Sequence, residues 1–234
     1  MIIGILQPGY LPWLGFFEQM YKSDVFVIYD DVQYDKEGWR NRNRIKTANG
    51  IQWLTVPVHM KLTEHPLINE IKIDNTVNWR KKHLASIKQN YAKAPFFKNY
   101  IDIFEYAYSK DWEYLVNLDI YFITKLAECL GIGNKNIIRS STLDLKGDRI
   151  GRLINLCKLF GADTFYEGEA GKNYIDEKEF LSHGIEVEFQ DYQYPIYNQL
   201  YGDFIPYLSV VDLLFNHGTE SLKILIGNGG EKGG

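Results

Sequence analysis

The sequence has only two cysteines, no long apolar run and no excess of basic residues. The cysteines, Cys129 and Cys157, fall inside helical patterns, which argues against a disulfide framework and for a reducing cytoplasm. No apolar run approaches the ~18 residues that span a bilayer, so we expect no transmembrane helix. The net charge of −4 argues against a nucleic-acid-binding protein, because such proteins are usually basic.

Several motif signatures are missing as well. The chain contains no HExxH or Cys-x-x-Cys spacing, so we expect no zinc site and assign no metal ligands. Neither a GxSxG nucleophile motif nor a GxxxxGK[ST] phosphate loop occurs, and the sequence identifies no cofactor. The segment MIIGILQPGYLPW has no basic residue ahead of its apolar stretch, and we interpret it as a first strand rather than a signal peptide.

Short apolar runs and helical patterns alternate from the start of the chain. Ile2–Leu6 and Val25–Tyr29 are apolar, and Trp13–Tyr21 between them has helical spacing, which predicts a βαβ unit with parallel strands. Further strands are expected at Asn136–Ser140, Thr164–Glu167 and Ile185–Phe189. Further helices are expected at Val77–Tyr91, Phe96–Tyr108, Trp112–Leu130, Asp148–Phe160 and Asp176–Ser182, with two short helical pieces near the C-terminus.

Asn49-Gly50 lies between two extended runs and predicts a β-hairpin. A two-residue turn there pairs Lys46 with Trp53, Arg44 with Thr55, and Ile45 with Leu54. Alternation then gives one apolar face, formed by Ile45, Leu54 and Val56, and one face that we call the basic hairpin face. The basic hairpin face comprises Arg42, Arg44, Lys46, Trp53 and Thr55.

The pattern as a whole predicts an α/β fold. We expect a mostly parallel sheet with flanking helices, an N-terminal βαβ unit, a β-hairpin and an inserted helical region. Residues 1–234 are expected to form a single domain, with a helical lobe around residues 77–130 and a flexible tail at residues 227–234.

Two segments after the first two strands are candidate sites. The turn at residues 7–13 lies where ligands of open parallel sheets collect, and it opens a helix whose N–H groups favour an anion. Asp30 and Asp31 could act as a base, accept from a sugar hydroxyl or an amine, or hold Mg²⁺. We expect one to face the cleft and the other to pair. The alternatives are a rigid connector and an acidic turn. These segments supply Gln7, Tyr10, Trp13, Asp30, Asp31 and Gln33.

The basic hairpin face is a candidate phosphate site. Arginine forks suit phosphate oxygens, and Trp53 could stack on a base or a sugar ring. The alternative is a solvated face whose arginines pair with Asp35 and Glu37. This segment supplies the candidates Trp39, Arg40, Arg42, Arg44, Lys46 and Trp53.

Later segments add weaker candidates. His83 lies on a helix and has an ordinary pKa near ~6.5, suited to acid–base work, but a lone helical histidine is more often a packing residue. The tyrosine-rich segment at residues 192–218 suits sugar recognition or an arm packed across the core. A glycine-bearing loop follows Glu167. The substrate-binding candidates here are Lys82, Tyr91, Glu167, Tyr194, Tyr197, Gln199 and Asn216.

Several of these segments are similar in sequence to a known protein family. The run from ILQPGYLPW to IQWLTVPV closely resembles the opening of the WbqC-like family, and WRKKHLASIKQNYAKAPFF, GDRIGRL, LFGADTFYEG and FIPYLSVVDLLFNHG resemble later parts of it in the same order. Many members have a histidine where this chain has Leu6, so a role for that position does not carry over. The opening is also similar in architecture to HIGH-type nucleotidyltransferases, although the chain lacks their histidine-rich signature and lysine-serine loop.

The resemblance implies that the protein acts on an activated sugar, because relatives are encoded among the genes for O-antigen and other surface polysaccharides. We therefore predict a cytoplasmic transferase that acylates or aminoacylates the amine of a nucleotide-linked sugar, with Asp31, His83 or Asp30 as base. The alternatives are an ATP-dependent nucleotidyl- or adenylyltransferase and a non-catalytic sugar-binding or scaffold protein. The expected partner is a small molecule; no nucleic acid is expected, and self-association stays open.

Overall fold

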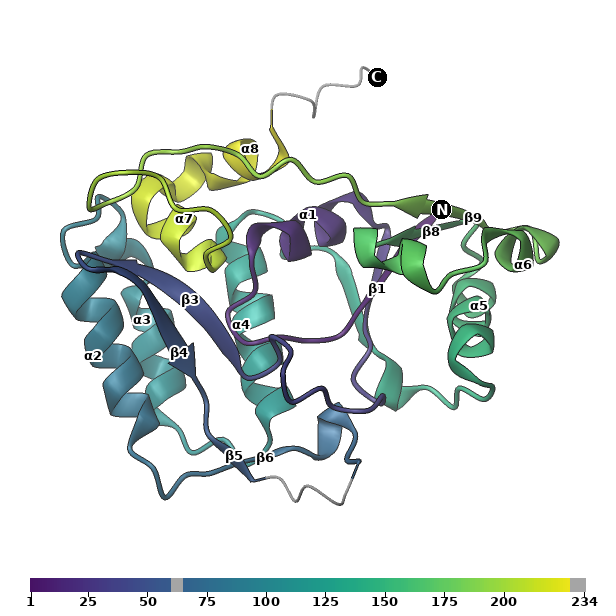
Figure 1. Cartoon of the computed structure of the whole chain (residues 1–234), viewed down its shortest axis with the longest axis horizontal. Helices are drawn as coiled ribbons and strands as arrows, with labels where there is room; N and C mark the ends of the chain where they lie inside the picture. The colour runs from purple at the N-terminus through teal and green to yellow at the C-terminus, as the bar shows by residue number, and fades with distance from the viewer. Residues whose placement is uncertain (60–64, 228–234) are drawn as a thin grey trace. The chain divides into compact units, whose positions relative to one another are not determined.

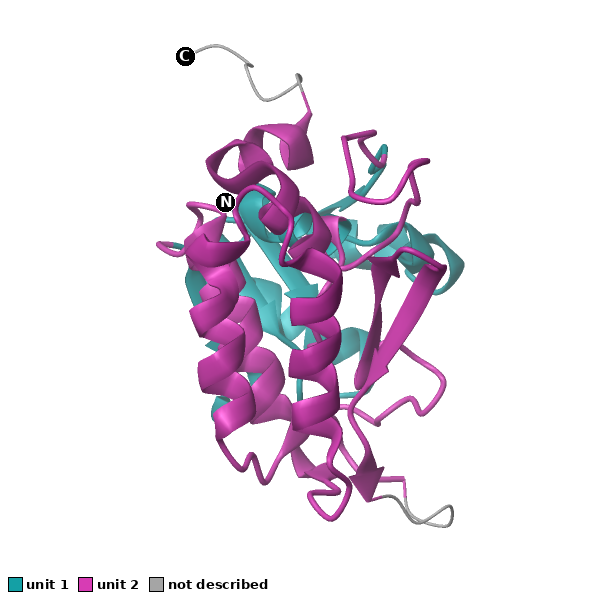
Figure 2. Ribbon diagram, turned by 90° about the vertical axis from the view of Figure 1, so that its left-hand side faces the viewer, with its two compact units in different colours: residues 1–7, 15–31, 135–193 teal, residues 8–14, 32–134, 194–234 magenta. Residues whose placement is uncertain are grey.

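The computed structural model describes residues 1–59 and 65–227, and the chain separates into two compact units (Figure 2). Unit 1 comprises residues 1–7, 15–31 and 135–193, and unit 2 comprises residues 8–14, 32–134 and 194–234. The predicted tail at 227–234 lies outside the described residues from position 228 onward. That the chain is a single domain stays a prediction.

Unit 1 is built on a five-stranded sheet in which every pair of neighbouring strands is parallel. The order is β7-β2-β1-β8-β9, which is 3-2-1-4-5 when the strands are counted along the chain. This order is typical of doubly wound nucleotide-binding sheets. The strands are β1 (Ile2–Leu6), β2 (Val25–Ile28), β7 (Asn136–Arg139), β8 (Thr164–Glu167) and β9 (Glu186–Phe189).

The helices of unit 1 are α1 (Leu14–Lys22), α5 (Arg149–Phe160) and α6 (Glu177–Ser182) (Figure 1). Since parallel crossovers are right-handed, α1 covers one face of the sheet and α5 and α6 cover the other. Helix α5 begins where the Asp148 side chain accepts a hydrogen bond from the Gly151 N–H at 2.8 Å. It ends at Gly161, whose φ of 65° is left-handed. The parallel βαβ unit predicted at the N-terminus is confirmed.

Unit 2 contains the inserted helices. Helices α2, α3 and α4 lie side by side (Figures 1 and 2). Their core is aromatic: the Phe104 ring centroid lies 5.5 Å from those of both Phe122 and Phe215. The helices are α2 (Trp79–Tyr91), α3 (Phe97–Ser109), α4 (Leu115–Cys129), α7 (Val210–His217) and α8 (Ser221–Ile226).

Unit 2 also contains the predicted hairpin, formed by β3 (Arg42–Thr47) and β4 (Gly50–Thr55). Its predicted register is wrong: Arg44 pairs with Trp53, and Thr47 pairs with Gly50. The turn is centred one residue earlier, because the Thr47 hydroxyl accepts from the Asn49 N–H at 3.1 Å and donates to the Gly50 carbonyl at 3.0 Å. The shift in pairing is even, so each side chain keeps its predicted face.

Two short strands escaped prediction, β5 (Val58–His59) and β6 (Lys72–Ile73), which pair antiparallel. Two-residue strands are too short to show a periodicity. The α/β class, the mostly parallel sheet, the hairpin and the inserted helices are confirmed. Across the described ranges, no helix has the length and apolar character needed to cross a membrane.

Candidate functional site

The carboxyl edge of the unit 1 sheet gathers the polar ends of its strands. In doubly wound sheets, ligands bind outside this edge at the point where the strand order reverses. Here the reversal lies between β1 and β8. Gln7 follows β1 directly, and Glu167 is the last residue of β8. The predicted candidates Gln7 and Glu167 therefore flank the switch point.

Asp30, which follows β2, is completely buried. Its carboxylate accepts from the Arg139 guanidinium at 2.7 Å, from the Ser141 N–H at 3.0 Å and from the Ser141 hydroxyl at 2.9 Å. The Ser140 hydroxyl adds a contact at 3.2 Å. These donors let the Asp30 carboxylate fix the turn after β7, and its complete burial leaves it no surface for a substrate.

Asp31 is paired as well. Its Oδ2 lies 2.5 Å from the Arg152 guanidinium, and each of these side chains is 18% exposed. The same guanidinium lies over the Tyr29 ring, 5.2 Å from its centroid. The prediction that only one of the two aspartates is paired is wrong, because Asp30 pairs with Arg139 and Asp31 pairs with Arg152.

Glu167 has a different environment. Burial raises its pKa to about 7, and the Gly168 N–H at 3.0 Å, Tyr174 and the Arg149 charge only partly oppose this. Gly171 is required beside it, because a β-carbon there would lie 2.4 Å from the Glu167 Cγ. A carboxyl group that titrates near neutrality can take or give a proton at physiological pH.

Arg149 completes this group. It is the first residue of α5 and exposed, and its guanidinium lies 4.0 Å from the Tyr174 ring centroid. No carboxylate of the described residues lies within ion-pair distance of it. A cation at a helix N-terminus attracts an anion. Sequence reasoning missed Arg149 and Arg152, although the Gly-Asp helix start before them was a usable signal.

In unit 2, the arginines of the basic hairpin face stack on indoles. Arg42 lies 5.2 Å from the Trp53 ring centroid and Arg44 lies 5.1 Å from that of Trp39. The guanidinium of Arg44 also donates to the Tyr207 carbonyl at 2.7 Å. Trp39 and Trp53 remain 43% and 45% exposed. The two arginines are half-buried, and Arg42 also donates to the Glu37 carbonyl at 2.6 Å, so the exposed part of this surface is mainly the two indoles.

Lys46 and Arg40 do not take part in this stacking on the indoles. Lys46 is 1% exposed, and its ammonium donates to the backbone carbonyls of Gly202 and Asp203. Arg40 donates to the Pro8 carbonyl at 2.9 Å, and burial lowers its pKa. Of the four basic candidates in this segment, Arg42 and Arg44 are therefore the two whose guanidinium groups stack on Trp39 and Trp53.

The histidine candidate is buried among aromatic rings. His83 Nδ1 lies 2.9 Å from the Tyr10 hydroxyl, which also bonds to the Tyr108 hydroxyl. The Trp79 ring packs against the imidazole at 5.3 Å. Burial lowers the pKa of His83 to about 4, and Tyr10 has no exposed surface. The environment of both residues is that of a packed core.

We expect the imidazole of His83 to stay neutral down to about pH 5, because its pKa is about 4. The measurement is an NMR titration of the histidine ring protons, with the His83→Gln variant identifying the signal. An accessible histidine would titrate near ~6.5. A midpoint near that value for His83 would contradict its burial.

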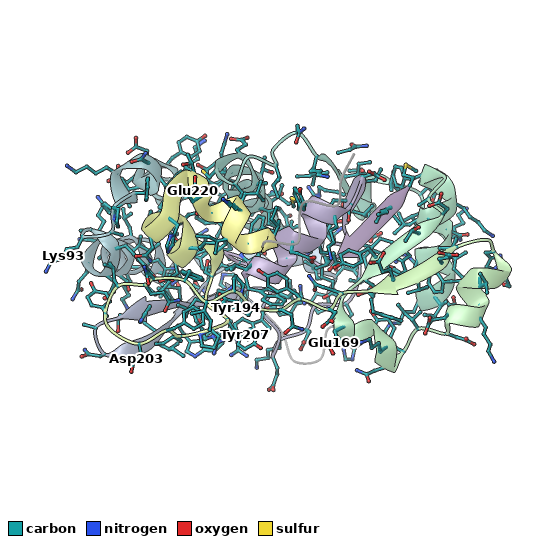
Figure 3. All side chains as sticks on the ribbon, turned by 90° about the horizontal axis from the view of Figure 1, so that it is seen from above. Lys93, Glu169, Tyr194, Asp203, Tyr207 and Glu220 are labelled. Atoms are coloured by element: carbon teal, nitrogen blue, oxygen red, sulfur yellow. The ribbon has the colours of Figure 1, made fainter. Side chains whose placement is uncertain are left out.

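The aromatic candidates near the C-terminus hold an extended arm. Tyr194 and Tyr207 lie together (Figure 3), with ring centroids 5.1 Å apart, and Trp13 stacks on Tyr194 at 6.5 Å. The Gln199 amide bonds to both backbone groups of Ile205. The remaining candidates are buried Tyr91 and Tyr197, half-buried Asn216, and exposed Gln33 and Lys82.

A buried acid, Asp212, contacts two of these candidates. Asp212 accepts from the Tyr91 hydroxyl at 2.8 Å, and burial raises its pKa to about 6. Asn216 donates to the Asp212 carbonyl at 2.7 Å. Nowhere in residues 1–59 and 65–227 do three or more His, Cys, Asp or Glu side chains group so that they could hold a metal ion.

The fold and the edge of the unit 1 sheet define a doubly wound α/β protein. By sequence comparison the chain belongs to the WbqC-like protein family, whose model matches residues 7–224. A relative from Mycobacterium tuberculosis, named uncharacterized protein Rv1507c, is 39% identical over 223 residues, which cover 94% of this chain and 95% of the relative. No solved structure matches the chain.

Proposed function

We propose that this protein transfers an acyl or aminoacyl group to the amine of a nucleotide-linked sugar in surface polysaccharide assembly. One observation carries the proposal: Glu167 ends β8 at the switch point of the sheet, near the exposed Arg149 that begins α5, and burial raises the pKa of the Glu167 carboxyl to about 7. A carboxylate of that pKa suits a base that accepts an amine proton. The arginine suits a phosphate.

In the proposed reaction, the amine nitrogen of the sugar attacks the acyl carbon of an activated donor. The carbon–nitrogen bond forms while the bond to the leaving group breaks, and the leaving group departs with its electron pair. Glu167 takes the proton that the nitrogen must lose. Arg149 holds the diphosphate, and the half-buried pair Arg42 and Arg44 of unit 2 is a separate, second candidate for phosphate binding. Asp31 is the alternative base, but its pairing with Arg152 at 2.5 Å makes it less available.

We expect the Glu167→Gln variant to lose about 10²–10⁴-fold in turnover, the usual contribution of a general base. The assay supplies UDP- and dTDP-linked amino sugars with acyl and aminoacyl donors and detects the product mass. Glu169→Gln, at a side chain that is 79% exposed, is the matched control. Unchanged turnover in Glu167→Gln would move the role to Asp31. Sugar binding without any product would favour the non-catalytic alternative.

The strand order favours a second candidate function, nucleotidyl transfer. The 3-2-1-4-5 order is a nucleotide-binding arrangement in general, and a helix N-terminus at its edge suits a triphosphate as well as a diphosphate. The discriminating observation is release of pyrophosphate from a nucleoside triphosphate. If pyrophosphate is released in proportion to the sugar consumed, nucleotidyl transfer becomes the preferred function.

A further inference from the structure

Unit 2 exposes three aromatic rings that the proposed function does not use. Trp39, Trp53 and Tyr207 are 43%, 45% and 53% exposed, whereas the other three tryptophans of the chain are buried or half-buried. All three exposed rings belong to unit 2, and we call them the aromatic surface of unit 2. Because large exposed apolar groups that lie together mark an interaction site, this surface is a candidate for ligand binding.

Arg44 joins the three residues. Its guanidinium lies 5.1 Å and 5.6 Å from the ring centroids of Trp39 and Trp53, and it donates to the Tyr207 carbonyl at 2.7 Å. The Arg44 carbonyl in turn accepts from the Ser209 N–H at 3.0 Å. The two indoles also contact each other, with centroids 5.1 Å apart and a tilt of 40° between their planes. The rings therefore form one connected surface.

The backbone holds this surface in shape at both ends. Tyr207 has a φ of 58°, a left-handed conformation that a residue with a bulky side chain rarely adopts, and its ring packs against Tyr194 (Figure 3). Gly9 lies so close to Trp39 that a β-carbon there would be 3.0 Å from the Trp39 carbonyl oxygen. A strained residue that its surroundings keep in place is typical of a functional site.

The charges at this surface indicate a negatively charged ligand. Arg42 lies over the Trp53 ring, and its guanidinium donates to the Glu37 carbonyl. Within the described ranges, neither Arg42 nor Arg44 forms an ion pair with a carboxylate. A carboxylate or phosphate on a ligand would form charge-assisted hydrogen bonds with these guanidinium groups.

The rings indicate a sugar chain. The negative face of an aromatic ring attracts the slightly positive C–H groups on the face of a sugar ring. Three rings at different tilts suit an oligosaccharide, because a chain can turn between successive sugar rings, whereas a single flat base stacks on one ring only. Single-stranded nucleic acid is disfavoured by the net charge of −4, since its binding depends on many basic groups.

We propose that the aromatic surface of unit 2 binds an acidic oligosaccharide. Its sugar rings pack on Trp39, Trp53 and Tyr207, and its acidic groups accept hydrogen bonds from Arg42 and Arg44. The proposal goes beyond the transfer reaction, whose base and helix N-terminus belong to unit 1. It does not depend on that reaction, because its test measures binding alone.

The test is calorimetric binding of a tetramer of galacturonic acid to the full chain, with cellotetraose as the neutral counterpart. We expect Trp53→Ala to raise the Kd of the acid tetramer about tenfold and Arg42→Gln to weaken the acid tetramer alone. The matched control is Tyr106→Ala, which should leave the Kd within about twofold of wild type. The Tyr106 ring is 47% exposed and also has a cation over it, Lys110 Nζ at 4.1 Å from its centroid.

Two further measurements keep the proposal falsifiable if Trp53→Ala does not fold. Trp39→Ala changes a residue outside both hairpin strands and is also expected to raise the Kd about tenfold. In NMR spectra of the wild-type protein, the acid tetramer should shift the indole N–H signals of Trp39 and Trp53 but not that of Trp79, which is buried.

Several results would overturn the proposal. One is that the wild-type protein does not bind the acid tetramer at millimolar concentration, or binds cellotetraose equally well. Another is that the folded tryptophan variants bind the acid tetramer within about twofold of wild type. Tighter binding of a deoxythymidine tetranucleotide than of the acid tetramer would identify a nucleic-acid surface instead.

Discussion

Replacing Arg139 by methionine is expected to lower the free energy of unfolding by about 3–5 kcal/mol. The variant removes the guanidinium that lies 2.7 Å from the buried Asp30 carboxylate. Because Asp30 has no exposed surface, its charge would lose its cation without gaining water. The hydroxyls of Ser140 and Ser141 would remain as donors but would not neutralise the charge. Urea-induced unfolding measures the loss.

A double variant distinguishes two causes of the stability loss, the packing contacts of Arg139 that are lost and the Asp30 charge that is left unpaired. Asp30→Leu with Arg139→Met removes both partners, and it is expected to be more stable than Arg139→Met alone. Arg149→Met, at an exposed position of the same unit, should cost less than about 1 kcal/mol. If Arg139→Met lowered the free energy of unfolding as little as this control, the Asp30 carboxylate would have to be hydrated in solution, which would contradict its burial.

The aspartates show how far sequence reasoning reaches at a site. Their position after a strand was enough to single out Asp30 and Asp31 as polar groups at the sheet edge. Their arginine partners lie more than a hundred residues later, and no local pattern connects them. The sequence therefore predicted where the acids lie, but it could not predict that both are paired.

The elements themselves were predictable because their signals are local. Asp148 and Gly161 mark the two ends of α5 in the sequence and in the structure. The order of the strands in the sheet could not be predicted in this way, since residues 32–134 intervene between β2 and its neighbour β7. Periodicity describes which face of an element is apolar, but it does not identify the neighbouring strand.

Burial of polar residues was the least predictable property. Alternation placed Lys46 on a polar face, and the segment at residues 202–203 covers it. Asp119 stands in a helical pattern where a charged residue normally indicates the solvent side. Only packing of the neighbouring elements of unit 2 shows that it is buried.

Raising the pH from about 4.5 to 7 is expected to destabilise the protein through Glu167. In the unfolded chain this carboxyl ionises near its ordinary pKa of 4.5, whereas in the folded protein burial raises the pKa to about 7. Between these two pH values the carboxyl is ionised in the unfolded chain but still protonated in the folded protein. Ionisation therefore stabilises the unfolded state relative to the folded state. The stability that the protonated group provides is lost as pH rises, by at most about 3 kcal/mol above pH 7.

The Glu167→Gln variant isolates this effect, because its neutral amide resembles the protonated acid. It is expected to be more stable than wild type at pH 8 and nearly equal to it at pH 4.5. His83, with its pKa lowered to about 4, acts in the opposite direction by destabilising the fold on acidification below about 6.5, and it does so equally in both proteins. The difference between the two stability curves therefore reports Glu167 alone. Parallel curves from pH 4.5 to 8 would show that Glu167 ionises normally, and the role of base at neutral pH would then lose its physical support.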